Sequence, residues 1–249
     1  MAIKVVESTI NHAAIAQNGH RYAASVVIPV CNEEAILEKL INDLQDRFSR
    51  LPLLIEFVIC ENGSRDATKN IGAHLAAKHQ HVRLVSLERP AYGAAIRAGV
   101  VQSDSEFVVI FNADLYDLTF FMRALDLFEA GADLIIGSKC LQQSIDRRPL
   151  LRRAITASFN WLLRVGFRYN GTDTHGMKAI RRSRIIPIFE RCRTEHEVFD
   201  TEFVLKAQRA GLKITELPVC VDDGRPARIA LLRRVPSTVR DLATIWRTL

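Results

Sequence analysis

The sequence lacks any long apolar run, and this absence sets the first limit on what the chain can be. Nowhere in its 249 residues does an uninterrupted apolar stretch approach the roughly 20 residues that a membrane-spanning helix needs. The N-terminus also lacks the apolar core of a secretion signal. We therefore expect a cytoplasmic protein that at most rests on the inner face of a membrane.

Closely spaced cysteines are also missing. The five cysteines are scattered and form no Cys-x-x-Cys pair, although disulfide frameworks and zinc sites usually show such pairs. We expect free thiols in a reducing compartment.

A strong charge of one sign is absent as well. The net charge of +6 fits anionic partners such as nucleotide phosphates, a lipid phosphate or an acidic membrane surface, but it is too dispersed to indicate nucleic acid. At 48% hydrophobic residues, the chain can bury one substantial core.

What the sequence does contain is a regular alternation of strand-like and helix-like segments. Strands are expected at residues 24–30, 53–60, 82–87, 133–137 and from Phe107, and helices at 33–48 (with Asn32 as N-cap), 67–78, 91–101 and 118–129. This alternation predicts an α/β fold with a mostly parallel twisted sheet flanked by helices.

After Gly137 the pattern becomes less regular. A loop is expected at 138–149, a turn at 169–176, strands at 177–180 and 213–219, and helices at 150–167 and 199–210. We divide the chain into a lead-in (1–23), one main domain (24–224) and a basic amphipathic helical tail (225–249).

The stretch from Phe107 to Asp117 carries the first candidate site. An apolar strand ends there in Asn112 and Asp114, whose side chains point the same way in extended chain. An amide oxygen beside a carboxylate suits a hard cation such as Mg²⁺ or Mn²⁺. For Asp114 a helix cap is an equally good interpretation on this stretch alone, and for Asp117 we favour the cap.

Polar residues follow three other strands at the same edge of the predicted sheet. These segments are Pro29–Glu34, Glu61–Asp66 and Tyr92–Gly99. With Asn112–Asp114, they converge where open α/β sheets bind ligands. In the order of these motifs the sequence resembles the family 2 glycosyltransferases, which have the GT-A fold, and among them the dolichol- or polyprenyl-phosphate sugar synthases. The resemblance runs from about Ala24 to Val235.

The resemblance implies a donor side. The residues that it assigns to the nucleotide are Pro29, Asn32, Glu33, Glu61, Asn62, Asp66, Gly93, Arg97, Asn112 and Ala113. Asn112 and Asp114 match the Asp-x-Asp metal motif, with Asn in place of its first acid. Glu61-Asn62 replaces an acidic pair, and Tyr116 stands where the lipid-phosphate branch usually has Gln.

The resemblance also implies an acceptor side. Gly137-Ser138-Lys139 matches a Gly-Ser-Arg element, and Asp173 to Lys178 matches the acceptor loop. Phe199 to Glu202 matches the motif at the start of the late helix. Asp200 and Glu202 are two apart on that helix, so we expect only one of them to reach the site.

The expected reaction is inverting, metal-dependent transfer of a sugar from a nucleoside-diphosphate sugar, with Asp114, Asp200 and Lys139 as the catalytic candidates. A polyprenyl phosphate acceptor is already ionised and needs cationic clamping rather than a base. Lys139, Arg147, Arg148, Arg152 and Arg153 can supply it, although such a cluster can also be a solvated helix face.

Two alternatives remain open: transfer to a hydroxyl with Asp200 as base, or a catalytically weak nucleotide-sugar binding protein, since Asn112 brings no charge. The tail interleaves arginines with aliphatic residues and Trp246, which fits a helix on anionic lipid. Packing on the domain or contact with a second copy fits it equally.

Overall fold

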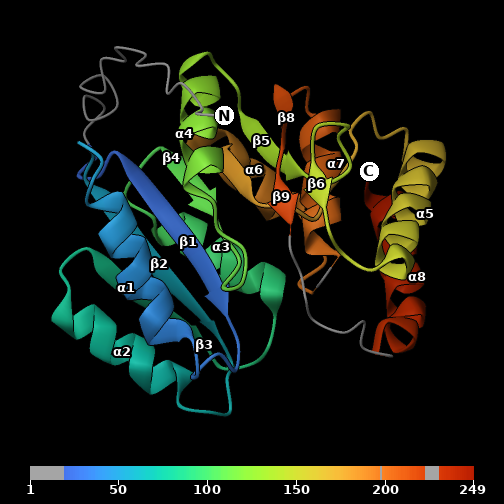
Figure 1. Ribbon diagram of the computed structural model, residues 1–249. Helices are drawn as coiled ribbons and strands as arrows, with labels where there is room; N and C mark the ends of the chain where they lie inside the picture. The colour runs from blue at the N-terminus through green and yellow to red at the C-terminus, as the bar shows by residue number, and fades with distance from the viewer. Residues whose placement is uncertain (1–19, 197, 222–229) are drawn as a thin grey trace.

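A seven-stranded sheet forms the centre of the molecule in the computed structural model, which describes residues 20–196, 198–221 and 230–249 (Figure 1). Its strands are β1 (Ala24–Val30), β2 (Ile55–Asn62), β3 (Val82–Leu87), β4 (Phe107–Ile110), β5 (Leu134–Ser138), β7 (Lys178–Arg181) and β8 (Ile214–Pro218). Two short strands, β6 (Ile145–Asp146) and β9 (Cys220–Val221), pair separately.

Eight helices are present in the described part of the chain. They are α1 (Leu37–Phe48), α2 (Thr68–Lys78), α3 (Tyr92–Gln102), α4 (Leu118–Glu129), α5 (Leu150–Phe167), α6 (Arg182–Arg191), α7 (Phe199–Arg209) and α8 (Ala230–Thr248). None of them is both long and apolar enough to cross a membrane.

The sheet order is β3-β2-β1-β4-β7-β5-β8, and every pairing except those of β7 is parallel. This confirms the predicted mostly parallel α/β fold. Strand order reverses between β1 and β4, and a crevice at the carboxyl ends of the strands is expected at such a reversal.

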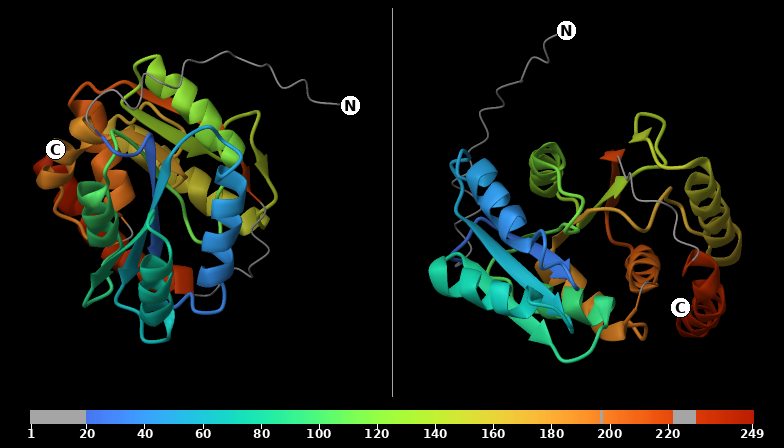
Figure 2. Two further views of the ribbon diagram at one scale, coloured as in Figure 1. Left: turned by 90° about the vertical axis from the view of Figure 1, so that its left-hand side faces the viewer. Right: turned by 60° about the horizontal axis from the view of Figure 1, so that its bottom comes forward.

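Helices cover both faces of the sheet (Figure 2). Alternate residues of β1 point into two cores, with Val26 and Ile28 in the core formed with α1 and α4, and Val27 in the core formed with α3, α6 and α7. Every residue of β1 is therefore buried, as expected for a parallel strand covered on both sides.

The predicted start of the first helix, and its predicted N-cap, were wrong. Helix α1 begins at Leu37 rather than at residue 33, and Asn32 does not cap it. Asn32 adopts a left-handed φ of 56°. The backbone N–H groups of Glu33 and Glu34 donate to the side chains of Thr68 and Asp66. They therefore do not form the first turn of a helix capped by Asn32.

Some predictions fall outside the described residues. These are most of the lead-in at 1–23 and the domain boundary at 224/225. The rest of the tail is the helix α8, in which Leu242 and Ile245 are buried against the domain.

Candidate active site

The turn after β4 places Asp114 at the carboxyl edge of the sheet. Asn112 and Leu115 exchange two backbone hydrogen bonds of 3.2 and 3.1 Å, which puts Ala113 and Asp114 at the tip of the turn. Asp114 is exposed there and Asn112 is half-buried. The Asp114 carboxylate thus remains accessible to a ligand at the strand reversal.

The side chains of Asp117 and Tyr116 bond to helices α4 and α1. The Asp117 carboxylate accepts a hydrogen bond of 2.7 Å from the backbone N–H of Thr119, so the predicted helix cap is confirmed. The Tyr116 hydroxyl donates to Asp43 on α1. The side chain that replaces the family's Gln is therefore turned toward α1.

The predicted donor-side residues at the end of β2, Glu61 and Asn62, are engaged in internal hydrogen bonds. Glu61 is 1% exposed, and its carboxylate accepts from Ser64 N at 2.5 Å and Ser86 Oγ at 2.6 Å. The Asn62 side-chain oxygen accepts from Ala91 N at 2.5 Å. These bonds join the turn after β2 to the segment that precedes α3.

The turn after β1 is tied to the same wall. The Asn32 side-chain oxygen accepts from Arg65 N at 2.8 Å, and Asp66 accepts from Glu34 N at 3.2 Å and Thr68 N at 3.0 Å. Pro29 is a buried strand residue opposite Cys60. The turns after β1 and β2, which carry predicted nucleotide-pocket residues, are thus joined by hydrogen bonds from backbone N–H groups to side-chain oxygens.

Gly93 and Arg97 instead connect α3 to α7. A Cβ on Gly93 would lie 2.4 Å from Phe199 Cγ, so glycine permits the two helices to touch. The Arg97 guanidinium lies over the Phe199 ring, 5.7 Å from its centroid, and donates to the Cys192 carbonyl at 3.4 Å. The structure gives both residues packing roles that the motif alone does not reveal.

Asp200 and Lys178 form a buried ion pair at the centre of the edge. Their Oδ2 and Nζ atoms are 3.0 Å apart, and the side chains are 6% and 2% exposed. Lys178 also donates to the Gly176 carbonyl at 2.9 Å. The other carboxylate oxygen, Asp200 Oδ1, is buried and has no hydrogen-bond partner among the residues that the structure describes.

Tyr92 of α3 bonds to Asp200 at the start of α7. Its hydroxyl donates to Asp200 Oδ2 at 3.4 Å. Desolvation, together with the negative charges of Asp200 and Asp114, raises the pKa of Tyr92 well above its usual value. The phenol therefore stays protonated and able to donate to Asp200.

Glu202 is turned away from Asp200, into the interior of the domain. It is 0% exposed and accepts from Thr194 N at 2.7 Å, Thr194 Oγ1 at 2.6 Å and Lys206 Nζ at 2.7 Å. Its carboxylate holds the segment before α7 instead of facing the crevice.

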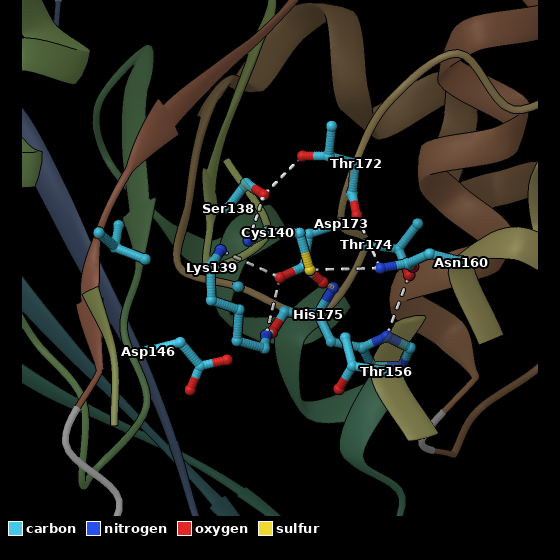
Figure 3. A network of polar contacts seen from close by, with 12 residues as sticks. Ser138, Lys139, Cys140, Asp146, Thr156, Asn160, Thr172, Asp173, Thr174 and His175 are labelled. Atoms are coloured by element: carbon cyan, nitrogen blue, oxygen red, sulfur yellow. Dashed lines mark hydrogen bonds and ion pairs between the residues drawn. The ribbon is translucent and has the colours of Figure 1, made fainter. Parts of the chain in front are cut away.

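The predicted acceptor loop is held in place by Lys139 and Asp173 (Figure 3). The Lys139 ammonium lies 2.9 Å from Asp173 Oδ2 and donates to the His175 carbonyl at 2.6 Å. Burial alone would raise the pKa of Asp173, but Lys139 and the backbone N–H of His175 outweigh it and lower the pKa. The carboxylate stays ionised as the anchor of the loop.

Glu216 of β8 is a site residue that sequence reasoning missed. Its carboxylate accepts from Thr172 N at 2.7 Å, Asp173 N at 3.1 Å and Thr172 Oγ1 at 2.9 Å. The only signal was an acidic residue within a short predicted strand. Asn160 of α5 holds the same loop by donating to the Thr172 carbonyl at 2.6 Å.

A cavity of about 710 Å³ lies beside this loop. Its lining is both basic and apolar and includes Lys139, Leu141, Asp146, Arg148, Leu150, Arg153, Ala154 and Ala157. Arg148 makes a two-pronged ion pair with Asp146, at 2.9 and 2.8 Å. Arg147 is exposed on the loop before α5 and Arg152 is half-buried on α5 itself.

The sheet edge offers few ligands for a divalent cation. Within the described ranges, no three His, Cys, Asp or Glu side chains cluster closely enough to hold a metal. Mg²⁺ in phosphate-transfer sites usually binds one or two carboxylates and completes its shell with substrate phosphates and water. Exposed Asp114, with Asn112 beside it, fits that kind of partial site.

Comparison with known proteins gives a family match over most of the chain. Residues 25–187 match the family model described as "Glycosyl transferase family 2". Glycosyltransferase AglD of Haloferax volcanii is 26% identical over 228 residues, covering 89% of this chain and 36% of that protein. Dolichyl-phosphate beta-glucosyltransferase ALG5A of Trichomonas vaginalis is 28% identical over 210 residues, covering 78% of this chain and 64% of the relative.

The chain thus spans about a third of one of these relatives and less than two thirds of the other. Among solved structures, glucosyl-3-phosphoglycerate synthase from Mycobacterium tuberculosis, crystallised with Mn²⁺, uridine-diphosphate and glucosyl-3-phosphoglycerate, superposes with a TM-score of 0.65. It is 18% identical, with 89% of this chain and 79% of that chain covered. This likeness shows a shared fold.

Proposed function

The chain belongs to glycosyl transferase family 2, and from that premise we propose that it transfers a sugar from a nucleoside-diphosphate sugar to a polyprenyl phosphate, with inversion, at the inner face of a membrane. The observation that carries the proposal is that the sheet edge that presents the exposed Asp114 after β4 also carries the buried Asp200–Lys178 ion pair, next to the loop that Lys139 and Asp173 anchor.

On the donor side, the turn after β4 offers the exposed Asp114 carboxylate where a diphosphate would lie. A divalent cation held by Asp114 and Asn112 would neutralise charge on the departing diphosphate. A fold relative was crystallised with Mn²⁺ and uridine-diphosphate, which supports this assignment. The side-chain oxygens of Asn32, Glu61 and Asn62 accept hydrogen bonds from backbone N–H groups, which supports a pre-formed donor pocket.

On the acceptor side, the cavity beside the loop suits a phosphate joined to an apolar chain. Lys139 and Arg148 have carboxylate partners, but a guanidinium has five N–H donors and Asp146 engages only part of them. Arg148 Nη1 faces Thr156 Oγ1 at 3.5 Å, and Arg153 lines the same cavity. Leu141, Leu150 and Ala154 supply the apolar lining. The name of the Trichomonas relative, a dolichyl-phosphate glucosyltransferase, supports this acceptor class.

A hydroxyl acceptor is the second candidate, and one observation favours it. Asp200 Oδ1 is buried at the edge without a hydrogen-bond partner in the described part of the chain, so it is available to take a proton from a bound hydroxyl. A phosphate acceptor needs no such base.

The test is transfer from a panel of radiolabelled nucleoside-diphosphate sugars to polyprenyl phosphate in detergent. The proposal requires a lipid product whose sugar is released by mild acid, and a reaction that Asp200→Asn slows without abolishing. Transfer only to hydroxyl acceptors, abolished in Asp200→Asn, would establish the second candidate. Metal-dependent donor binding without transfer to either acceptor would indicate a nucleotide-sugar binding protein.

A further inference from the structure

Helix α5 presents an apolar face to solvent. Six large apolar side chains on it are between 39% and 78% exposed: Leu150, Leu151, Ile155, Trp161, Leu162 and Val165. At 3.6 residues per turn they lie, with Ala154 and Ser158, in an uninterrupted arc of about 140° that contains no charged residue. A helix on the surface of a soluble protein normally turns its polar side outward. A contiguous exposed apolar patch of this kind indicates an interaction surface.

The charges at the edges of this face are all of one sign. Arg152, Arg153 and Arg164 are the charged residues of α5, and the helix contains no Asp or Glu. On the helical wheel they lie beside the apolar arc, on its two flanks. An apolar face bordered by arginines is the pattern of a helix that lies in the plane of an anionic bilayer surface.

Charge also argues against a second copy of the chain as the occupant. A two-fold interface places the same patch on both sides, so it would bring the arginines of two α5 helices together with no acid on either helix to neutralise them. Like charges facing each other across an interface oppose association. An anionic surface matches both the apolar arc and its flanks.

The inner side of α5 is attached to the candidate acceptor loop. Asn160 donates to the Thr172 carbonyl at 2.6 Å, and the Phe159 ring packs against the His175 ring with 5.6 Å between centroids. The cavity beside the loop is partly lined by Leu150 and Arg153 of α5. A surface that covered the outer face of α5 would therefore lie next to the loop.

We propose that the outward face of α5 docks on an anionic lipid bilayer and so presents a membrane-embedded acceptor to the loop. The docking itself stands on α5 alone, whereas its purpose rests on the function proposed above. Helix α8 lies at the same end of the molecule as α5 (Figures 1 and 2). Its Trp246 is 70% exposed and provides a second contact.

The chain carries its own probe for this proposal. Its two tryptophans, Trp161 and Trp246, are 64% and 70% exposed. Trp161 lies on the proposed surface of α5, and Trp246 lies on α8. Vesicles of phosphatidylglycerol and phosphatidylcholine should shift the tryptophan emission to the blue, and pure phosphatidylcholine or high salt should reduce the effect. Trp246→Phe should retain a shift from Trp161. An unchanged emission maximum of Trp161 in anionic vesicles would overturn the proposal.

Variants in the arc separate docking from other effects. Leu151→Gln with Leu162→Gln should weaken flotation with anionic vesicles at least roughly tenfold. The matched control is Val101→Gln on α3, which removes a 46% exposed apolar side chain far from α5 and should leave binding unchanged. Equal flotation of both variants contradicts the proposal, as does a dimer in sedimentation that only the α5 variant dissolves.

The flotation assay contains neither donor nor acceptor, so its outcome is independent of the proposed reaction. Vesicle binding without any transfer to polyprenyl phosphate would refute the proposed function and leave the docking surface intact. Transfer in detergent by a protein that does not bind anionic vesicles would refute the docking surface alone.

Discussion

Asp114 and Asp117 follow the same strand, yet the structure gives them different surroundings. Asp117 caps α4, whereas Asp114 is exposed at the tip of its turn. We predict that Asp114→Ala lowers transfer by at least about a hundredfold and changes the free energy of unfolding by less than about 0.5 kcal/mol. Asp117→Ala is the control. It should cost about 1 kcal/mol of stability and retain transfer, as measured by urea unfolding and product formation. Full turnover of Asp114→Ala in chelated buffer would refute the metal assignment.

A substitution at Asn112 tests the metal site by adding a charge instead of removing one. The Asn112 side chain can offer a cation an oxygen atom but no negative charge. Asn112→Asp should tighten binding of Mn²⁺ in the presence of a nucleoside diphosphate, since each added carboxylate strengthens a site for a hard cation. Isothermal titration of the variant and the unaltered protein measures the change. Identical affinities would mean that residue 112 is not a ligand.

The lowered pKa of Glu202 makes the free energy of unfolding depend on pH. Burial alone would raise its pKa, but Lys206 and the Thr194 side chain and N–H lower it below that of the unfolded chain. The carboxylate therefore stabilises the fold above the unfolded pKa, and this contribution is lost as pH falls through the lowered folded pKa. Glu202→Gln should be less stable at pH 7 by about 3 kcal/mol.

The same variant should lose less stability than the unaltered protein on acidification below about pH 4, where an unperturbed Glu becomes protonated. Urea unfolding at several pH values measures both curves. Parallel curves would show that Glu202 does not contribute to the acid sensitivity.

At the residue scale, the sequence pointed to candidate side chains where the local pattern was enough. The apolar strand that begins at Phe107 ends in polar residues, and this pattern alone singled out Asn112 and Asp114. Glu216 was not singled out, because its partner Thr172 lies 44 positions away in the chain. The buried pairing of Lys178 with Asp200 likewise depends on the antiparallel placement of β7 beside β4, which no local pattern encodes.

Helices and strands were predicted correctly where the hydrophobic periodicity and the residues that end an element, such as proline and glycine, indicated the same boundaries. The expected ranges 82–87, 118–129 and 150–167 coincide with β3, α4 and α5. Helix α6 was not predicted, since Pro187 interrupts its pattern and proline usually opposes a helix interior. The start of α1 was placed too early because the backbone N–H groups of Glu33 and Glu34 donate to Thr68, the first residue of α2, and to Asp66 just before it.

At the scale of the elements, the close packing of α3 against α7 at Gly93 leads to a prediction about stability. An added methyl at Gly93 meets Phe199 at 2.4 Å, whereas one at Gly166 on α5 meets nothing within 4 Å. Gly93→Ala should therefore destabilise the fold by about 1–3 kcal/mol by separating α3 from α7. Gly166→Ala, also helical, should be neutral or stabilise by up to about 1 kcal/mol. Thermal unfolding distinguishes them, and equal effects would show that α3 and α7 do not depend on this contact.

At the scale of the whole molecule, the two halves of the sheet carry different parts of the candidate site. Strands β1 to β4 carry the residues of the proposed donor side. Lys139 directly follows β5, and Lys178 and Glu216 lie in β7 and β8. The sequence predicted the first half well because its elements alternate regularly. In the second half, β7 runs antiparallel and inserts between β4 and β5, so the arrangement follows from long-range pairing.

Because the donor would contact the turns after several strands at once, its binding should stabilise the entire fold. A nucleoside diphosphate at about 100 times its dissociation constant adds about 2.7 kcal/mol, which corresponds to a rise in Tm of roughly 5–10 °C for a chain of this size. We expect one base of a uridine, guanosine, adenosine and cytidine panel to give this shift, and only when Mn²⁺ or Mg²⁺ is present. Asp114→Ala should lose the metal-dependent part, whereas Asp117→Ala should retain it. A shift that is equal with and without the cation, in both variants, would place the diphosphate away from the turn after β4.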